Sequence, residues 1–292
     1  MSDRVWTVRD ALEWTTGFLG RAGDDAPRRS AEWLLSAATG LSRIELYAYF
    51  DRPLSEGERA VLRESVRRRA DGEPLQYVTG EVAFRHLVLK VRPGVLIPRP
   101  ETEVLVGEAL LGIEGVSGPT VADVCTGSGA IGLSIAQERP DATVWATDIA
   151  PEAVRVAGEN AERLHLADRV RVLEGDLLEP LPPGVRGRLD AVVANPPYVP
   201  SSDVPDLPRE VAGFEPRLAL DGGVDGLDIF RRLLVEARTW LAPGGLLAVE
   251  LDERRVQAAA EEAVEWYEDL RVVRDLAGRD RVLVARLTNV GA

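Results

Sequence analysis

The sequence predicts an α/β fold in which a doubly wound, mostly parallel sheet of seven strands follows a small helical domain. From about residue 119, apolar runs such as "TVADV", "TVWATD" and "LDAVVANPP" alternate with helical stretches, as in βαβ units. The last two apolar runs, "LRVVRDL" and "RVLVARL", are joined only by "AGRD". Because this connection is too short for a helical crossover, we expect the sheet to end in an antiparallel hairpin.

Helical signals dominate the first 75 residues. Val5, Val8, Leu12 and Leu19 recur at helical spacing. Ser55 followed by Glu58 forms a capping box ahead of "RAVLRESVRRRA", and Thr7 with Asp10 is a similar helix start. We therefore predict a helical N-terminal domain over residues 1–75.

Strand-forming residues follow this domain. Val88, Leu89 and Val91 lie between Gly80 and the turn residues Pro93 and Gly94. They predict a β-hairpin linker over residues 76–98. The α/β domain is then predicted over residues 99–292, beginning with a helix capped by Thr102.

The overall charge argues against nucleic acid as the main partner. Lys and Arg number 35 and Asp and Glu 48, so the net charge is 35 − 48 = −13, whereas nucleic-acid binding needs a basic face. There is no apolar run long enough to span a membrane, and the start of the chain lacks the apolar stretch of a secretion signal. With a single cysteine, Cys125, we expect a cytoplasmic protein that does not bind a membrane.

A glycine-rich turn joins the first predicted strand of the α/β domain to its helix. The stretch "ADVCTGSGAIG" contains Gly127, Gly129 and Gly132 in G-x-G-x-x-G spacing. Such glycines allow a ligand to approach the backbone at a helix N-terminus. Asp148 ends the next strand, where a carboxylate can accept both hydroxyls of a ribose. These features predict an adenosine-containing cofactor.

Two further carboxylates favour S-adenosylmethionine over a dinucleotide. Asp123 precedes the turn, where it suits a cationic amino group and would repel a pyrophosphate. Asp176 closes the third strand, where it could accept the adenine amino group, although a helix cap or turn residue is an equally good interpretation of Asp176. Gly132 lies inside the predicted helix and is expected to serve helix–sheet packing.

The stretch "VVANPPYVP" ends the fourth strand, at the edge where open α/β sheets bind ligands. Its prolines mark a rigid exit from the sheet. The Asn195 side-chain oxygen and the Pro196 carbonyl could accept both N–H groups of a planar amide or exocyclic amine, while Tyr198 stacks on it. Such a site would methylate nitrogen by positioning and electrostatics rather than with a strong base.

The sequence resembles the HemK/PrmC family, which methylates the glutamine side-chain amide in the GGQ motif of peptide chain release factors. The resemblance covers almost the whole chain and includes "EPLQYVTGE", "LIPRPETE", "DVCTGSGAIGLSIA", "NPPYVP" and "FEPRLALDGGVDGLDIFRRLL". It implies a Rossmann-like class I S-adenosylmethionine-dependent methyltransferase domain, with release factors docking on the helical domain. S-adenosyl-L-homocysteine would be the product of the cofactor.

The motifs also carry residue roles over to this chain. Asn195, Pro196 and Tyr198 would be catalytic, and no metal is implied. Substrate would be held by Asn195, Pro196, Pro197 and Tyr198, with Phe84 and the "RPETE" residues, among them Arg99 and Glu101, walling the site. The cofactor would be bound by Asp123, Thr126, Gly127, Ser128, Gly129, Asp148, Asp176, Leu177 and Asn195.

The chain departs from the family pattern at two places. Cys125 stands where many members have glycine, and "ELDERR" follows the fifth strand where the family more often has a glutamate, a short residue and glycine. The catalytic motifs alone also fit a ribosomal protein glutamine, or an exocyclic amine of adenine or guanine, as the methyl acceptor. A protein that keeps the fold without catalysis is a third interpretation, against which the intact Asp123, Asp148 and N-P-P-Y argue.

Overall fold

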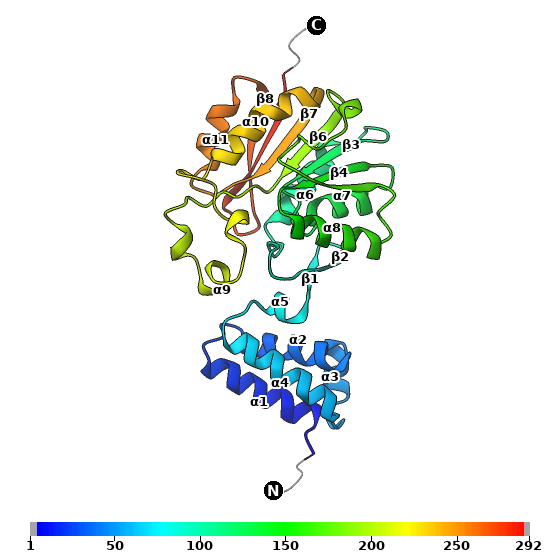
Figure 1. The fold of residues 1–292 in the computed structure, drawn as a ribbon, viewed down its shortest axis with the longest axis vertical. Coiled ribbons are helices and arrows are strands. Elements are labelled where there is room, and N and C mark those ends of the chain that lie inside the picture. Colours follow the sequence, from blue (N-terminus) through cyan, green and yellow to red (C-terminus); the bar gives the residue numbers. More distant parts are fainter. Residues whose placement is uncertain (1–4, 289–292) are drawn as a thin grey trace. The chain divides into compact units, whose positions relative to one another are not determined.

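The structure is a computed structural model that describes residues 5–288 (Figure 1). The chain divides into two compact units. The first comprises Met1–Glu81 with Pro208–Phe214, and the second comprises Val82–Leu207 with Glu215–Ala292. The domain boundaries predicted from the sequence stay a prediction, and they did not include the return of residues 208–214 to the first unit.

The first unit is helical. Its helices are α1 (Val8–Arg21), α2 (Pro27–Thr39), α3 (Arg43–Ala48), α4 (Glu56–Ala70) and α5 (Leu75–Thr79). Both predicted capping boxes are confirmed, and Ser42 with Glu45 forms a third at α3. Apolar faces of α1, α2 and α4 pack into one core that includes Leu12, Leu34 and Leu62.

Residues 208–214 contain the short helix α9 (Arg209–Ala212), which belongs to this helical unit. The Arg209 guanidinium donates to the carbonyl oxygen of Asp71 at 3.1 Å. Arg69 donates to Glu210 at 3.0 Å and also pairs with Asp24. The segment is therefore attached to the end of α4 although it is distant in sequence.

The second unit is built on a seven-stranded sheet in the order β5-β4-β3-β6-β7-β9-β8. All pairs are parallel except those of β9, which pairs antiparallel with β7 and β8. This confirms the predicted fold class. The strands are β3 (Thr120–Val124), β4 (Thr143–Asp148), β5 (Val170–Glu174), β6 (Leu189–Ala194), β7 (Leu241–Glu250), β8 (Tyr267–Arg274) and β9 (Asp280–Leu287).

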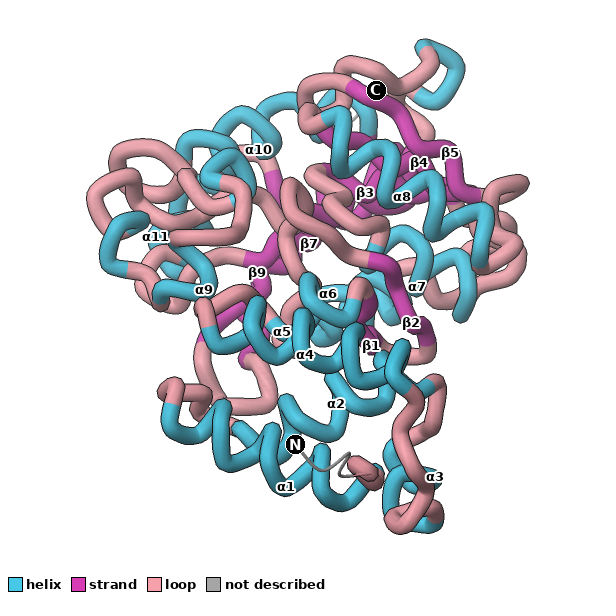
Figure 2. Tube along the Cα trace, turned by 60° about the horizontal axis from the view of Figure 1, so that its bottom comes forward, coloured by secondary structure: helices cyan, strands magenta, loops and turns pink. Residues whose placement is uncertain are grey.

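Helices cover both faces of the sheet (Figures 1 and 2). Alternate residues of a strand point to opposite faces, so Val121 of β3 packs in one apolar core and Ala122 in the other. Residues of α6, α7 and α8 form the first core, and residues of α10 and α11 form the second. These helices are α6 (Thr102–Gly112), α7 (Ala130–Glu138), α8 (Pro151–Arg163), α10 (Asp228–Trp240) and α11 (Val256–Ala263).

A two-stranded sheet, β1 (Glu81–Phe84) with β2 (Leu87–Lys90), lies within the predicted linker. The buried Asn160 side chain of α8 binds it: Oδ1 accepts from the backbone N–H of Lys90 at 2.8 Å, and Nδ2 donates to the Lys90 carbonyl at 3.0 Å. The same Nδ2 donates to the carbonyl of Ser128 at 2.9 Å. Asn160 therefore connects β2, α8 and the glycine-rich turn.

We expect Asn160→Ala to destabilise the second unit by about 3 kcal/mol, because it leaves buried backbone groups of Lys90 and Ser128 without partners. Urea unfolding followed by circular dichroism measures the loss. Glu162→Ala, an exposed change on the same helix, is the matched control and should cost less than about 0.5 kcal/mol. Equal losses in the two variants would contradict the role given to Asn160.

Candidate active site

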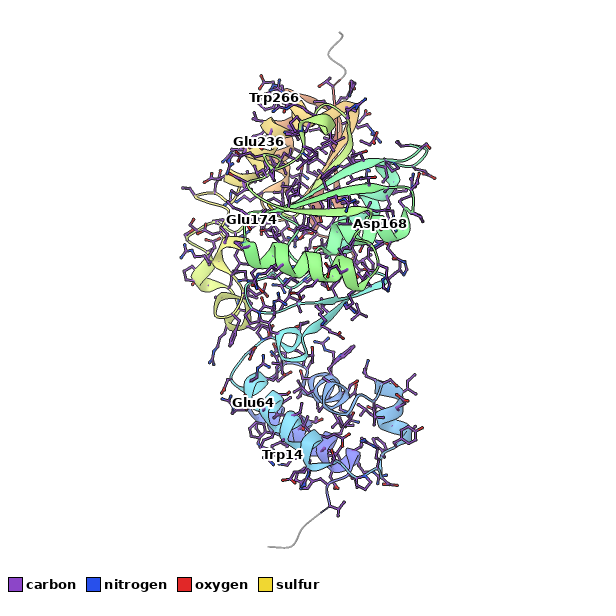
Figure 3. All side chains as sticks on the ribbon, turned by 45° about the vertical axis from the view of Figure 1, so that its right-hand side comes forward. Trp14, Glu64, Asp168, Glu174, Glu236 and Trp266 are labelled. Atoms are coloured by element: carbon purple, nitrogen blue, oxygen red, sulfur yellow. The ribbon has the colours of Figure 1, made fainter. Side chains whose placement is uncertain are left out.

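The register of the parallel strands brings four strand ends to one edge of the sheet. Val124 of β3 pairs with Thr147 of β4 on one side and with Ala194 of β6 on the other. Asp148 pairs with Glu174 at the end of β5. Figure 3 labels Glu174 at this end of β5 and Asp168 near its opposite end. The loops that follow these strands therefore open at the same edge, where α/β folds bind ligands.

A cavity lies at this edge, between the strand ends and the segments 94–98 and 216–219. Its wall is mostly apolar, with two carboxylates and one guanidinium. Many of the residues predicted from sequence to bind cofactor or substrate line it: Thr126, Gly127, Ser128, Asp148, Asp176, Leu177, Asn195 and Pro197.

The glycine-rich turn adopts left-handed backbone conformations. The φ angle is +57° at Gly127 and +86° at Gly129, values that glycine adopts without strain. Cys125 also has a positive φ, +59°, which explains why glycine would suit this position. Burial and the nearby Asp148 carboxylate raise the pKa of the Cys125 thiol, so it stays protonated and is a poor nucleophile.

Asp123 lies beneath the turn and does not line the cavity. Its Oδ2 accepts from the Thr126 hydroxyl at 2.5 Å and from the Gly132 N–H at 2.8 Å. A Cβ on Gly132 would stand 2.9 Å from that oxygen, so glycine is required there. Burial raises the pKa of Asp123 to about 7. In this structure Asp123 organises the turn, and its direct contact with a cofactor stays a prediction.

Asp148 faces the cavity and also orders its neighbours. Its Oδ2 accepts from the Gly127 N–H and its Oδ1 from the Ala150 N–H, each at 2.9 Å. Burial raises its pKa above the ordinary value despite these bonds. Ile149, which follows it, is 52% exposed and lines the cavity. Ile149 was not assigned to the site from the sequence, although it directly follows Asp148, which was.

The other end of the cavity is more polar than predicted. Asp176 forms an ion pair of 2.6 Å with Arg232 of α10, and both line the cavity. Arg232 lies in "DIFRRLL", within a motif quoted for the family resemblance, yet no residue of that motif was assigned to the site. Any ligand group that binds beside Asp176 would therefore contact a carboxylate that is already paired with the Arg232 guanidinium.

The N-P-P-Y stretch leaves β6 beside the cavity. Asn195 and Pro197 line it, whereas Pro196 and Tyr198 do not. The Asn195 Nδ2 donates to the Thr102 hydroxyl at 3.2 Å. The Tyr198 hydroxyl donates to the buried carboxylate of Glu250 at 3.4 Å.

A second segment, residues 216–226, packs against the N-P-P-Y stretch and the residue that follows it. Val199 exchanges backbone hydrogen bonds with Leu220 and Gly222, at 2.9 and 2.8 Å. A Cβ on Gly222 would lie 2.6 Å from the carbonyl oxygen of Pro197, so the two segments approach as closely as backbones can. The "ALDGG" of the family motif thus acts as a brace for N-P-P-Y.

The predicted wall residues differ in their surroundings. Phe84 is 1% exposed and packs in the core with residues of α6, away from the cavity. Arg99 pairs with the buried Glu215 at 2.6 Å, which joins the "RPETE" and "FEPRLAL" motifs. Glu101 is the N-cap residue of α6, and neither it nor Arg99 lines the cavity. Thr102, also of "RPETE", does line it; it is the first residue of α6 and not the cap predicted from the sequence.

Within residues 5–288, no helix is long and apolar enough to cross a membrane. No cluster of three or more His, Cys, Asp or Glu side chains in the same range could hold a metal ion.

Two family models match the chain. Residues 10–80 match the PrmC N-terminal domain, and residues 105–207 match the methyltransferase small domain. Among solved structures, a methyltransferase from Pyrococcus furiosus superposes with a TM-score of 0.51 at 20% identity, over 70% of this chain and 91% of that one. A Thermus thermophilus 16S rRNA N2 G1207 methyltransferase gives 0.52 at 20% identity, over 71% of this chain and 49% of that one. At these identities the structures show the fold alone.

Curated relatives named release factor glutamine methyltransferase match nearly end to end. The protein from Moorella thermoacetica is 48% identical over 282 residues, which is 96% of this chain and 98% of the relative. Those from Rhodopirellula baltica and Deinococcus radiodurans are 42% and 40% identical, over 97% and 96% of this chain and 97% and 98% of their own. With a seven-stranded methyltransferase sheet and N-P-P-Y beside its cavity, the chain belongs to the release factor glutamine methyltransferase family.

Proposed function

We propose that this protein transfers a methyl group from S-adenosylmethionine to the side-chain amide nitrogen N5 of the glutamine in the GGQ motif of peptide chain release factors. The observation that carries the proposal is the position of Asn195. It directly follows β6, lines the cavity beside the glycine-rich turn, and has its Nδ2 bound to Thr102. Its Oδ1 is then the atom that can accept an N–H from an amide substrate.

The cavity has the chemistry that S-adenosylmethionine requires. The turn 126–128 forms one wall with no side chain larger than threonine, so a ligand can approach the backbone. Asp148 would accept the ribose hydroxyls, with Ile149 against the adenine and Asp176 near its amino group. The buried Ser128 hydroxyl oxygen has no hydrogen-bond partner among the described residues and is available to the methionine end.

A primary amide is a weak nucleophile because its nitrogen lone pair is delocalised into the carbonyl group. Asn195 Oδ1 and the Pro196 carbonyl would accept its two N–H groups and favour a pyramidal nitrogen with a localised lone pair. When bound, the cofactor supplies an electrophilic methyl group: the S–C bond breaks as the N–C bond forms, and the sulfonium becomes a thioether.

No strong base is needed in this arrangement. The amide nitrogen is far more acidic after it has gained the methyl group, so its proton can leave late. Catalysis would then depend on positioning, by Asn195 at the cavity wall together with the Pro196 carbonyl and Tyr198, which do not line the cavity but follow Asn195 in the chain. We also propose that release factors dock on the helical unit, since a small loop such as GGQ offers the cavity little surface of its own.

The substrate is tested by incubating the protein with labelled S-adenosylmethionine and, separately, purified release factors, ribosomal proteins and RNA. We expect label on a release factor and a mass increase of one methyl group on its GGQ glutamine. A release factor in which that glutamine is replaced by glutamate should take no label. Label on RNA or on a ribosomal protein alone would overturn the proposal.

Asp148→Asn should weaken S-adenosylmethionine binding by roughly 10–100-fold, since a neutral side chain accepts hydrogen bonds from the ribose less strongly than a carboxylate. Isothermal titration calorimetry measures the change in Kd. Asp190→Asn is the matched control, because Asp190 also accepts a backbone N–H, that of Thr120, but at the opposite edge of the sheet. An unchanged Kd in Asp148→Asn would remove Asp148 from the cofactor site.

Asn195→Ala should lower kcat by roughly 10²–10³-fold, because it removes one of the two acceptors that orient the substrate amide. The Kd for S-adenosylmethionine should change less than about threefold, a difference of well under 1 kcal/mol. Single-turnover methylation gives the rate and calorimetry gives the Kd. A large loss of cofactor affinity with the rate of the bound complex preserved would show that Asn195 serves the cofactor instead.

A further inference from the structure

Asp176 and Arg232 form an ion pair on the wall of the cavity. Asp176 follows β5, and Arg232 lies on α10, 56 residues later in the chain. Nη2 of Arg232 donates to Oδ2 of Asp176 at 2.6 Å, a short charge-assisted hydrogen bond. Both residues line the cavity, as do Leu177, next to Asp176, and Ile229, one helical turn before Arg232. The pair is therefore part of the wall that a ligand would contact.

Folding stability does not explain this pair. The side chains of Arg232 and Asp176 are 47% and 36% exposed, and ion pairs in contact with water contribute little to the free energy of folding. Glu236, one turn further along α10, lies 3.8 Å from the same Nη2, so Arg232 has a second acidic neighbour. The position of the pair on the cavity wall points to a ligand instead.

The backbone of the turn that carries Asp176 is constrained. Leu177, which follows Asp176, is buried and has a φ of +45°, a left-handed conformation that strains a residue of this size. A Cβ on Gly175 would lie 2.9 Å from Cγ of Pro180, so glycine is required before Asp176. Strained backbone of this kind is concentrated at ligand sites. The turn thus fixes the Asp176 carboxylate at the cavity wall at a cost in conformational energy.

The ion pair leaves both acceptors and donors for a ligand. An ionised carboxylate has two oxygens that only accept, and a guanidinium has several N–H groups that only donate. The bond between Arg232 and Asp176 joins one N–H to Oδ2 and leaves Oδ1 and the other N–H groups outside this bond. Because the two side chains are in contact, an acceptor and a donor lie next to each other on the cavity wall.

The amino edge of adenine has the complementary pattern. Its N6 amino group is a donor, and the ring nitrogens on either side of that group, N1 and N7, only accept. A carboxylate beside a guanidinium can therefore bind the amino group and one of these ring nitrogens together. Hypoxanthine has an oxygen in place of the amino group, so it would set an acceptor against the Asp176 carboxylate.

We propose that Arg232 is a specificity-determining residue for the cofactor. With Asp176 it selects the amino edge of adenine: Asp176 accepts from N6, and Arg232 donates to the ring nitrogen beside it, N1 or N7. This inference rests on the proposed function in one respect, the placement of the adenine amino group near Asp176. It does not depend on which molecule accepts the methyl group.

The first test titrates the full chain by calorimetry with S-adenosylhomocysteine and with its 1-deaza, 3-deaza and 7-deaza analogues, in each of which a C–H replaces one ring nitrogen. We expect the native protein to bind either the 1-deaza or the 7-deaza compound roughly tenfold more weakly, because that compound lacks the acceptor for Arg232. Arg232→Met keeps the length of the side chain without its donors. In this variant the same replacement should cost less than about threefold, since the partner of the ring nitrogen is gone.

The controls separate this contact from a general effect on the fold. N3 does not neighbour the amino group, so Arg232→Met should weaken binding of the 3-deaza compound and of S-adenosylhomocysteine by the same factor. Arg231→Met is the matched variant, because Arg231 pairs with Asp225 and Glu262 and does not line the cavity. It should leave the loss caused by each deaza replacement as in the native protein. Circular dichroism checks that both variants fold.

The second test measures selectivity for the amino group itself. The native protein should prefer S-adenosylhomocysteine over S-inosylhomocysteine, its 6-oxo analogue, by roughly 10–100-fold, the discrimination that a two-point contact to a base edge provides. In Asp176→Asn the preference should fall below about threefold, because an amide can turn its N–H toward the oxo group. An unchanged preference in Asp176→Asn would show that the amino edge is recognised elsewhere.

These titrations contain no methyl acceptor, so their outcomes are separate from those of the proposed function. A native protein that does not bind S-adenosylhomocysteine removes the cofactor site, and this inference with it. If the native protein binds it, a deaza replacement that costs as much in Arg232→Met as in the native protein overturns the role of Arg232 alone. A loss confined to proteins that keep Arg232, with selectivity lost in Asp176→Asn, supports the proposal.

Discussion

The in-register parallel pairing of β3 with β4 and β6 is the constraint on which the site depends. It sets Val124, Thr147 and Ala194 side by side, so the glycine-rich turn, Asp148 and N-P-P-Y leave the sheet at one edge. A shift of one residue in either pair would turn alternate side chains to the wrong face and separate these groups. Strand ends that lie up to about 70 residues apart in the chain thereby form one cavity.

Local backbone conformation at the turn is maintained by a buried carboxylate rather than by glycine alone. Asp123 accepts from Thr126 and from the N–H of Gly132, so it closes the turn on the first residues of α7. This explains why the turn keeps its path although Cys125 occupies a left-handed position. The burial that raises the pKa of Asp123 also keeps water away from these hydrogen bonds.

The substrate side of the site depends on groups from four separate segments. Thr102 begins α6, Glu250 ends β7, and the backbone of residues 220–222 braces Val199. Arg99 and Glu215 join two of these segments by an ion pair whose carboxylate is buried. Rigidity of this kind suits a reaction that works by holding a weak nucleophile in place rather than by supplying a base.

The strand–helix alternation, the antiparallel hairpin and the capping boxes were predictable, because each depends on residues close in sequence. The motifs at the carboxyl ends of the strands could also be placed from the sequence. Parallel strands in one sheet bring their carboxyl ends to the same edge, whatever their side chains are. The contacts of the side chains inside the site were harder to predict from the sequence. Asp123 was predicted on the cavity wall and lies beneath it, while Arg232 and Glu250 were not assigned to the site.

What the sequence determined by itself was the fold class, the nature of the cofactor site and the N-P-P-Y motif. The tertiary structure decided which carboxylate faces the cavity, which one holds the turn, and which one lies behind Tyr198. The physical reason is that a carboxylate's role follows from its burial and its donors. Those donors come from the glycine-rich turn, the start of α7 and the segment after β6, which the packed sheet brings to carboxylates of other strands.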